Sequence, residues 1–424
     1  MRSILEMYNI GMGPDSALNI VPYRACREIY QSIADSKQVV HHIEVDFYNE
    51  YARLGIEAGC KKDVLAGFEF ANFPIDIRYD EPTPPAARAP YTFDVMIYTS
   101  ETEITARHRV VSISGGNYMI TDKIKPPKYT FNSFDEMNNF FKNHKMSFLE
   151  FVSLFDPKEK IMDHFKTCIE LMDTIIYRSL RKSGNLLLQD QGIHYTRRAK
   201  HMYENVSKNE TDAEKTVRLI SSYAYAIGEE VPEKCWMVAC PTCASTSVVW
   251  SVLKWYRDKN PDVPEEKIIN ALCGAGLIAS LVENNARLAA SQVGCQGPIG
   301  TSCGIAAAAL ANLMFDATMD EMGRAFEMAY EHTLGLICDS VCPLPLIPCI
   351  QRCAAFAQRA LDIAILNHSL MGQPELCKLD DVIKVLNDTG LDLITKNKRI
   401  AVGGFKEHAP YSVAPSALEK GGGC

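Results

Sequence analysis

The spacing of apolar residues changes once along this chain, and that change constrains the possible folds more than any other feature. In residues 43–48 and 91–98, apolar and polar residues alternate as they do in half-buried strands. Residues 109–116 combine a strand-like stretch with a glycine turn. From residue 133 onward, apolar residues recur instead at helical spacing. We therefore predict an α+β N-terminal domain followed by an all-α domain.

The composition between these patterns suggests where the domains end. Residues 1–121 form the predicted first domain, and residues 122–132, with adjacent prolines and several lysines, form a linker. Residues 133–406 form the predicted helical domain, and residues 407–424 form a tail with little periodicity. Helices are expected over residues 134–142, 147–183, 212–226, 248–256, 265–283, 304–314, 319–334 and 350–367. Their alanines and glycines let helix backbones approach closely around a central element.

Charge and hydropathy limit the partners that suit the chain. Its 424 residues, 47% of them hydrophobic and 23% charged, are ample for large hydrophobic cores. A net charge of −8 without a block of lysines and arginines argues against a nucleic-acid partner. The longest apolar stretches, such as residues 305–313, are shorter than the roughly 20 residues of a membrane span, so we expect no membrane partner. The first residues have no apolar core of a signal peptide, so a cytoplasmic location is expected.

The cysteines carry the strongest chemical signal. Fifteen of them without a secretion signal indicate reduced thiols, some of them metal-bound, rather than disulfides. Cys295, Cys338 and Cys349 lie in one region, and Cys424 is the last residue, after three glycines. Three thiolates can hold three irons of a [4Fe–4S] cluster. The fourth iron is then free to act as a Lewis acid or to be covered by a mobile thiol, which is typical of an enzyme rather than of an electron carrier.

The words around these cysteines resemble a known family. They are Val-Gly-Cys-Gln-Gly at 293–297, Glu-His-Thr-Leu-Gly-Leu-Ile-Cys-Asp at 331–339 and Pro-Cys-Ile-Gln-Arg at 348–352. Shorter matches occur at 10–14, 21–25, 112–116 and 241–242. In these words the chain resembles the bacterial iron–sulfur-dependent L-serine dehydratases (L-serine ammonia-lyases) of the single-chain type.

This resemblance implies a cofactor, a reaction and an assembly. It implies a [4Fe–4S] cluster on Cys295, Cys338 and Cys349, with Cys424 as a removable fourth ligand, and no PLP. The helical domain is then the catalytic one. The implied reaction is β-elimination on a small anionic amino-acid-like substrate, with water lost and the product hydrolysed to a 2-oxo acid and ammonia. A homodimer is also implied.

Several family words are changed in this chain. The family's Ser-Ser-Ser-His-Thr run is replaced by Asp-Ser-Ala-Leu-Asn-Ile at 15–20, and its Gly-His-His-Thr-Asp by Gly-Cys-Lys-Lys-Asp at 59–63. Its Pro-Thr-Asn-Gly loop is Pro-Thr-Cys-Ala at 241–244. The expected histidines are therefore missing, and the substrate stays open between L-serine and a related hydroxy acid. A C–S lyase of the cysteine desulfidase type and a catalytically silent sensor are the alternatives.

The remaining polar residues supply the site candidates. Elimination needs a base that reaches the Cα proton of the substrate. A lysine can serve if burial lowers its pKa, and a carboxylate can serve as well. An interior polar side chain must find a partner, and the substrate is one possibility. The candidates are Lys62, Asp63 and His332 for proton transfer or for hydrogen bonds beside it; Ser16, Asn19, Thr242, Cys243, Asn285, Gln296 and Arg352 for substrate binding; and Cys295, Cys338, Cys349 and Cys424 for metal.

Each candidate also has a purely structural interpretation. Lys61, Lys62 and Asp63 are equally well explained as a solvated turn, and Asp15 is another possible base. His332 also fits a satisfied core histidine, and Arg352 an ordinary salt bridge. The Cys-x-x-Cys at 240–243 is interpreted as pocket lining rather than as a redox pair. Cys303, Cys342 and Cys353 are interpreted as small core residues.

Overall fold

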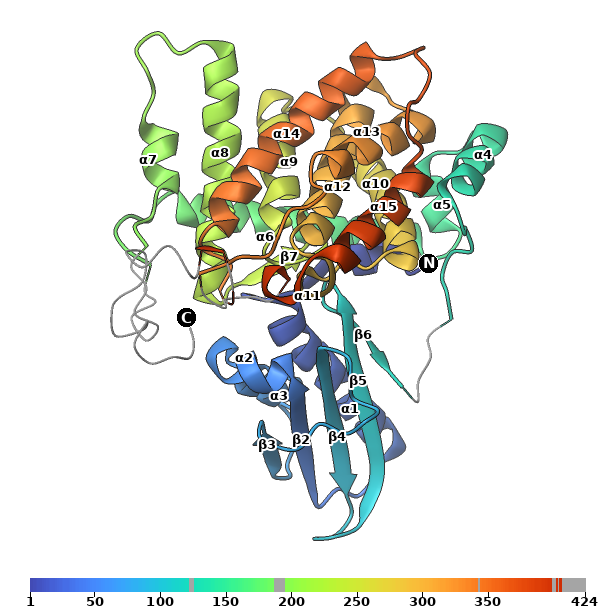
Figure 1. Cartoon of the computed structure of the whole chain (residues 1–424), viewed down its shortest axis with the longest axis vertical. Helices are drawn as coiled ribbons and strands as arrows, with labels where there is room; N and C mark the ends of the chain where they lie inside the picture. Colours follow the sequence, from blue (N-terminus) through green and yellow to red (C-terminus); the bar gives the residue numbers. More distant parts are fainter. Residues whose placement is uncertain (122–125, 187–194, 342–343, 399–401, 403, 406–424) are drawn as a thin grey trace.

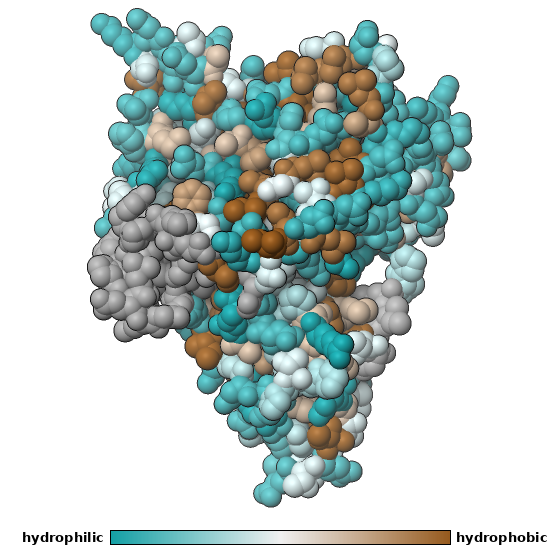
Figure 2. All heavy atoms as spheres, in the orientation of Figure 1, coloured by the Kyte–Doolittle hydropathy of each residue, from teal (hydrophilic) through white to brown (hydrophobic). Residues whose placement is uncertain are grey.

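The computed structural model joins a sheet part to a larger helical part (Figure 1). It describes residues 1–121, 126–186, 195–341, 344–398, 402 and 404–405. Figure 2 shows mostly hydrophilic residues over the visible surface of the sheet part, with apolar residues gathered near the middle of the helical part. Strands and helices are both present, as the sequence predicts, and helices dominate the second part of the chain.

The sheet has five strands in the order β3-β2-β4-β5-β6. They are β2 (His42–Asn49), β3 (Ile75–Arg78), β4 (Tyr91–Tyr98), β5 (Ile104–Ser114) and β6 (Asn117–Ile120). Only β2 and β3 run parallel, and the other neighbours are antiparallel. The predicted strand at 91–98 is confirmed, and so is the glycine turn, where Gly115 and Gly116 have φ of +58° and +82°.

Three helices cover one face of this sheet. They are α1 (Val21–Ser36), α2 (Glu50–Ala58) and α3 (Cys60–Gly67). Helix α1 follows the π-helical turn η2 (Ser16–Ile20), α2 follows the strand β2, and α3 follows α2. Alternate residues of β2 and β4, such as Phe47 and Phe93, pack against them in a core of their own. The other face carries buried charges that are paired, for example Asp94 with Arg109 at 2.7 Å.

The helical part is built from twelve helices among the described residues. They are α4 (Phe134–His144), α5 (Phe148–Ser153), α6 (Lys158–Ser179), α7 (Ala199–Glu204), α8 (Asp212–Glu230), α9 (Thr246–Lys259), α10 (Glu265–Asn285), α11 (Ala290–Val293), α12 (Gln296–Phe315), α13 (Met319–Glu331), α14 (Cys349–Ser369) and α15 (Leu379–Asp392). Short 3₁₀ turns lie at Ile4–Met7 (η1), Val231–Glu233 (η4) and Thr395–Asn397 (η5). Ser133 caps α4 as expected, because its side chain accepts a hydrogen bond from the Glu136 N–H.

One predicted helix is wrong. The sequence predicts a single helix over 147–183, whereas the chain forms α5 and α6 with a break at 154–157. Pro157 stands immediately before α6, has no N–H to donate, and disfavours helical backbone in the residue before it. A capping box at Ser147 and Glu150 closes the start of α5, so the shorter helix has its own terminus.

The first residues of the chain belong to the helical core. Strand β1 (Asn9–Met12) pairs antiparallel with β7 (Trp236–Ala239), and Tyr8 donates a hydrogen bond to the carbonyl of Leu272 at 2.8 Å. Ile4 and Tyr8 are fully buried in the main hydrophobic cluster. The boundary at residue 121 stays a prediction, and the structure adds that the chain enters the helical part before it forms the sheet.

Helix α12 is the centre of the helical part. It packs against α9, α10, α13 and α14. By length and composition it is apolar enough to cross a membrane, with a mean hydropathy of 1.4, but 89% of that window is buried inside the protein. A helix apolar on all sides and covered by other helices is the expected core of a large helical fold.

A close approach between two helices of this core predicts a measurable effect on stability. A Cβ placed on Gly304 of α12 would lie 2.5 Å from two ring carbons of Phe326, whereas on Gly276 of α10 it would meet nothing nearer than 3.0 Å. Gly304→Ala should therefore lower the free energy of unfolding by about 1–3 kcal/mol, despite better helix propensity. Gly276→Ala should change it by less than about 1 kcal/mol. Urea unfolding followed by circular dichroism distinguishes the two, and equal effects would contradict the packing argument.

Candidate active site

A cavity of about 340 Å³ is lined by the end of β5 and by residues of the helical part. Figure 1 shows this end of β5 next to the helical part. The thiol-bearing residues Cys295, Cys338, Cys349 and Cys353 all line it. The opposite wall comes from residues 111–115 of β5 and its turn and from residues 15–17 at the start of η2, and residues 286–292 after α10 complete the lining. Sequence-distant segments of both parts of the protein thus enclose one space, as expected for a ligand site.

Three helices begin at this cavity. Ser245 is the N-cap of α9, Cys295 is the N-cap of α12, and Cys349 is the first residue of α14, and each lines the cavity. The N-terminal end of a helix carries about half a positive charge and unpaired N–H groups. The cavity is therefore biased towards thiolates and towards an anionic ligand.

The loop that carries Cys338 is fixed by its neighbours. Gln296 accepts a hydrogen bond from the Gly335 N–H at 2.8 Å and donates one to the Leu386 carbonyl at 3.2 Å. The Cys338 N–H donates to the Asn397 carbonyl at 2.8 Å. Because both ends of the Gln296 amide are used by backbone groups, this predicted substrate residue instead positions the loop that presents Cys338.

The charges around the thiols favour a thiolate at Cys295. A hydrogen bond with Cys338 lowers the pKa of Cys295, and the nearby charge of Arg352 lowers it further against the effect of burial. The same hydrogen bond and burial raise the pKa of Cys338. Arg352 is held in place by Asp339 at 2.9 Å and by the Ile337 carbonyl at 3.1 Å. Arg352 was a candidate both for substrate binding and for an ordinary salt bridge. The structure shows the salt bridge to Asp339, and the guanidinium charge of Arg352 lies near the thiol of Cys295.

Two predicted substrate residues reach the cavity, Ser16 and Thr242. Ser16 is the first residue of η2 and is buried. The Thr242 hydroxyl lies 2.8 Å from that of Ser245, which in turn accepts a hydrogen bond from Ser302 at 2.7 Å. This chain of hydroxyls stands at the start of α9, so it is well placed to donate a hydrogen bond to a carboxylate there.

Four predicted residues within the described part of the chain, Asn285, Cys243, Lys62 and His332, do not line the cavity. Asn285 donates to the Asn132 carbonyl at 2.9 Å, and Cys243 is fully buried between β7 and α9. Burial raises the pKa values of both Cys240 and Cys243, which disfavours a reactive thiolate in the Cys-x-x-Cys word.

Lys62 and His332 are exposed. Cys424 and Cys342 lie outside the described residues. The roles assigned to all of these residues stay predictions.

Asp63 and Asn19 lie together behind the cavity wall. Asn19 donates to Asp63 at 2.7 Å and to the Ala58 carbonyl at 2.9 Å, and it accepts from the Asp15 N–H at 3.0 Å. These bonds tie η2, which carries Ser16, to α2 and α3. Burial raises the pKa of Asp63 to about 7.

Glu283 and Asp15 are carboxylates that line the cavity, and Glu283 was missed as a candidate. The Glu283 side chain is 5% exposed, and its Oε1 has no hydrogen-bond partner among the described residues. Burial raises its pKa, and its nearest cation is Arg2 at 3.8 Å. Asp15 uses one oxygen to accept from the N–H groups of Ala17 and Leu18, both at 2.8 Å. The sequence did contain one signal for Glu283. It is a single carboxylate at the end of a predicted helix whose residues 268–282 are mostly apolar, and a carboxylate beside buried residues is unusual.

The raised pKa of Asp63 predicts a pH-dependent stability. An unfolded aspartate has a pKa of about 3.9, so between pH 4 and 7 the folded state holds a proton that the unfolded state has lost. The wild type should lose stability as the pH rises through this window, by on the order of 1–3 kcal/mol relative to Asp63→Asn. Thermal unfolding at pH 5, 6, 7 and 8 measures the difference, with the exposed Asp76→Asn as the control. A constant difference across this range would show that Asp63 is ionised throughout.

Comparisons with known proteins identify a family and several relatives. The family described as "Serine dehydratase alpha chain" matches residues 33–406. An L-serine dehydratase of Streptomyces coelicolor is 26% identical over 450 residues, which cover 95% of this chain and 98% of that protein. One from Helicobacter pylori is 27% identical over 95% of this chain and 98% of its own length. L-serine dehydratase 2 of Escherichia coli is 32% identical over 58% of this chain and 54% of its own length.

The family match spans the described cavity residues from Ala89 through Cys353 as well as most of the sheet. The relatives that align over nearly their whole length show that the likeness is not confined to the cysteine words. The chain therefore belongs to the serine dehydratase alpha chain family.

Proposed function

We propose that this protein is a lyase that eliminates water from L-serine or from a closely related small β-hydroxy amino acid, giving a 2-oxo acid and ammonia. One observation carries the proposal: Cys295, Cys338 and Cys349 line a single cavity at which three helices begin. The relatives named L-serine dehydratase that align over nearly the whole chain support the choice of substrate class.

The three thiols suit a [4Fe–4S] cluster. They line the same cavity, two of them share a hydrogen bond, and the Arg352 charge beside them favours thiolates. Cys295, Cys338 and Cys349 would hold the cluster, which would supply Lewis acidity towards the substrate hydroxyl. The chain's other residues bind the substrate, exclude water and move the proton.

The substrate carboxylate is placed at the start of α9. The hydroxyls of Thr242 and Ser245 line the cavity there, and the helix N-terminus favours an anion. Arg287 is an exposed cation on the lining and attracts an anionic substrate to the entrance. Apolar side chains such as Ile113 and Ile299 complete the walls and keep water from the reacting atoms.

Glu283 is the proposed base in place of the missing histidines. It lines the cavity, its Oε1 has no hydrogen-bond partner among the described residues, and burial raises its pKa above the usual range of a carboxyl group, which favours proton uptake. Asp15 is the second carboxylate on the lining and is positioned to pair with the substrate ammonium. Lys62 and Asp63 stay outside the cavity lining and are not part of this proposal.

The ligand assignment predicts a contrast between two cavity cysteines. Cys338→Ala should abolish most of the iron and the visible absorbance of the anaerobically purified protein, because a proposed ligand is lost. Cys353→Ser should keep both, because this thiol lines the same cavity but donates to the Ala244 carbonyl at 3.3 Å. Iron analysis and absorbance spectra measure the outcome. Unchanged iron in Cys338→Ala would refute the assignment.

The proposed base predicts a loss of turnover without a loss of iron. On L-serine, the wild type should release 2-oxo acid and ammonia in equal amounts, and Glu283→Gln should lower kcat by about 10²–10⁴-fold. The exposed Glu69→Gln is the matched control. Sulfide released from L-cysteine without turnover of L-serine would support a C–S lyase instead. Full turnover by Glu283→Gln at equal iron content would place the base elsewhere.

A further inference from the structure

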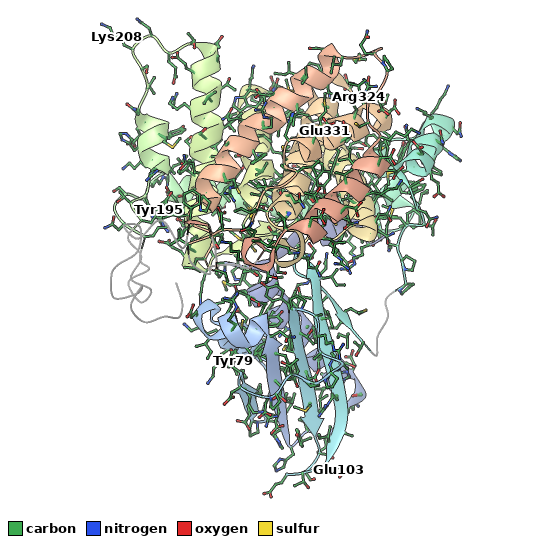
Figure 3. The ribbon with its side chains drawn as sticks, viewed as in Figure 1. Tyr79, Glu103, Tyr195, Lys208, Arg324 and Glu331 are labelled. Carbon is green, nitrogen blue, oxygen red and sulfur yellow. The ribbon has the colours of Figure 1, made fainter. Side chains whose placement is uncertain are left out.

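A second group of possible metal ligands lies in the helical part, apart from the cavity. Glu327 and Glu331 stand one turn apart on α13, and Cys377 lies in the segment between α14 and α15. A ligand atom of each lies within 4.8 Å of the other two. None of the three lines the candidate active site. Figure 3 labels Glu331 on the helical part, well above the sheet in that view.

The buried member of this group is incompletely satisfied. Glu327 is only 6% exposed, and its Oε1 has no hydrogen-bond partner among the described residues. A buried carboxylate oxygen without a partner costs free energy, so it is normally paired with a cation or a proton. Burial and the neighbouring Glu331 raise the pKa of Glu327 to about 8, as expected for two carboxylates that share a site.

The nearby cations form their ion pairs and hydrogen bonds with other residues, although the charge of Arg324 lowers the pKa of Glu327 against the effect of burial. Arg324 lies 3.6 Å from Glu375 and donates to the Leu370 carbonyl at 3.4 Å, and Lys378 pairs with Asp135 at 2.9 Å. Within the described part of the chain, no ion pair of 4.0 Å or less includes Glu327 or Glu331. The group thus brings together two carboxyl groups and a soft sulfur donor, with no ion pair to either carboxyl group among the described residues.

We propose that Glu327, Glu331 and Cys377 bind a transition-metal ion of the Zn²⁺ class, separate from the cavity cysteines. Two carboxylates and a thiolate form a mixed oxygen and sulfur donor set that Zn²⁺ accepts and that Mg²⁺ does not favour. Three protein ligands leave one tetrahedral position for water. Glu331 and Cys377 are exposed, so an ion can enter from solvent.

Such an ion would connect two separate segments. Helix α13 leads into the loop that carries Cys338, and Cys377 lies just before α15, whose Leu386 carbonyl accepts the hydrogen bond from Gln296. A metal bridge between α13 and the start of α15 would therefore hold both supports of that loop in one arrangement. The ion has a structural role in this proposal and takes no part in elimination.

Protection of the Cys377 thiol tests the site. Cys377 is the one exposed cysteine of the described residues, so its alkylation by iodoacetamide can be followed by peptide mass spectrometry in the full-length protein. Micromolar Zn²⁺ should slow alkylation about tenfold or more in the wild type, because a metal-bound thiolate is withheld from the reagent. Mg²⁺ at the same concentration should have no effect.

Three isosteric variants separate ligation from simple charge attraction. Glu327→Gln and Glu331→Gln should lose the protection, whereas Glu375→Gln, which removes an equal charge beside the site, should keep it. Thermal unfolding gives a second readout: Zn²⁺ should raise the Tm of the wild type and not that of Cys377→Ser. The proposal is overturned if Zn²⁺ protects nothing, or if Glu375→Gln loses protection as fully as Glu331→Gln.

Discussion

The positive ends of three helices at one cavity are the constraint on which the rest of the site depends. The starts of α9, α12 and α14 repel one another unless negative charge lies between them. The lowered pKa of Cys295 favours such a charge from within the chain, and the proposed anionic substrate would add to it. The arrangement also explains why hydroxyls, rather than further cations, surround the start of α9: the backbone N–H groups already supply much of the attraction.

Holding those helix ends together requires a rigid support, and α12 provides it. Its alanines and glycines allow neighbouring helices to pack closely, and most of its surface is buried. The rigid end of α12 carries Cys295, while Cys338 lies on a loop that needs Gln296, Asn397 and Leu386 to fix it. Precision at the site thus comes partly from the packed core and partly from a few hydrogen bonds around one loop.

Local patterns predicted some of this structure, and long-range pairing determined the rest. The alternation at 91–98, the glycine turn and the three cavity cysteines were all readable from short words. The break at Pro157 was overlooked because the apolar spacing continues across it. Glu283, Asn19 and Gln296 differ in role for reasons that no spacing reveals. Glu283 lines the cavity with one oxygen that has no hydrogen-bond partner among the described residues. Asn19 and Gln296 are occupied by hydrogen bonds to backbone and side-chain groups.

The pairing of β1 with β7 has a consequence for how separable the two parts are. The chain begins inside the helical core, leaves it to build the sheet, and returns near Tyr129, whose carbonyl accepts a hydrogen bond from the Met1 amino group at 2.9 Å. In topological terms the sheet is an insertion rather than a preceding module. A single cut near residue 121 would strip β7 of its neighbour and remove Ile4 and Tyr8 from the core, so the helical part can be isolated only by excising an internal stretch and rejoining its ends.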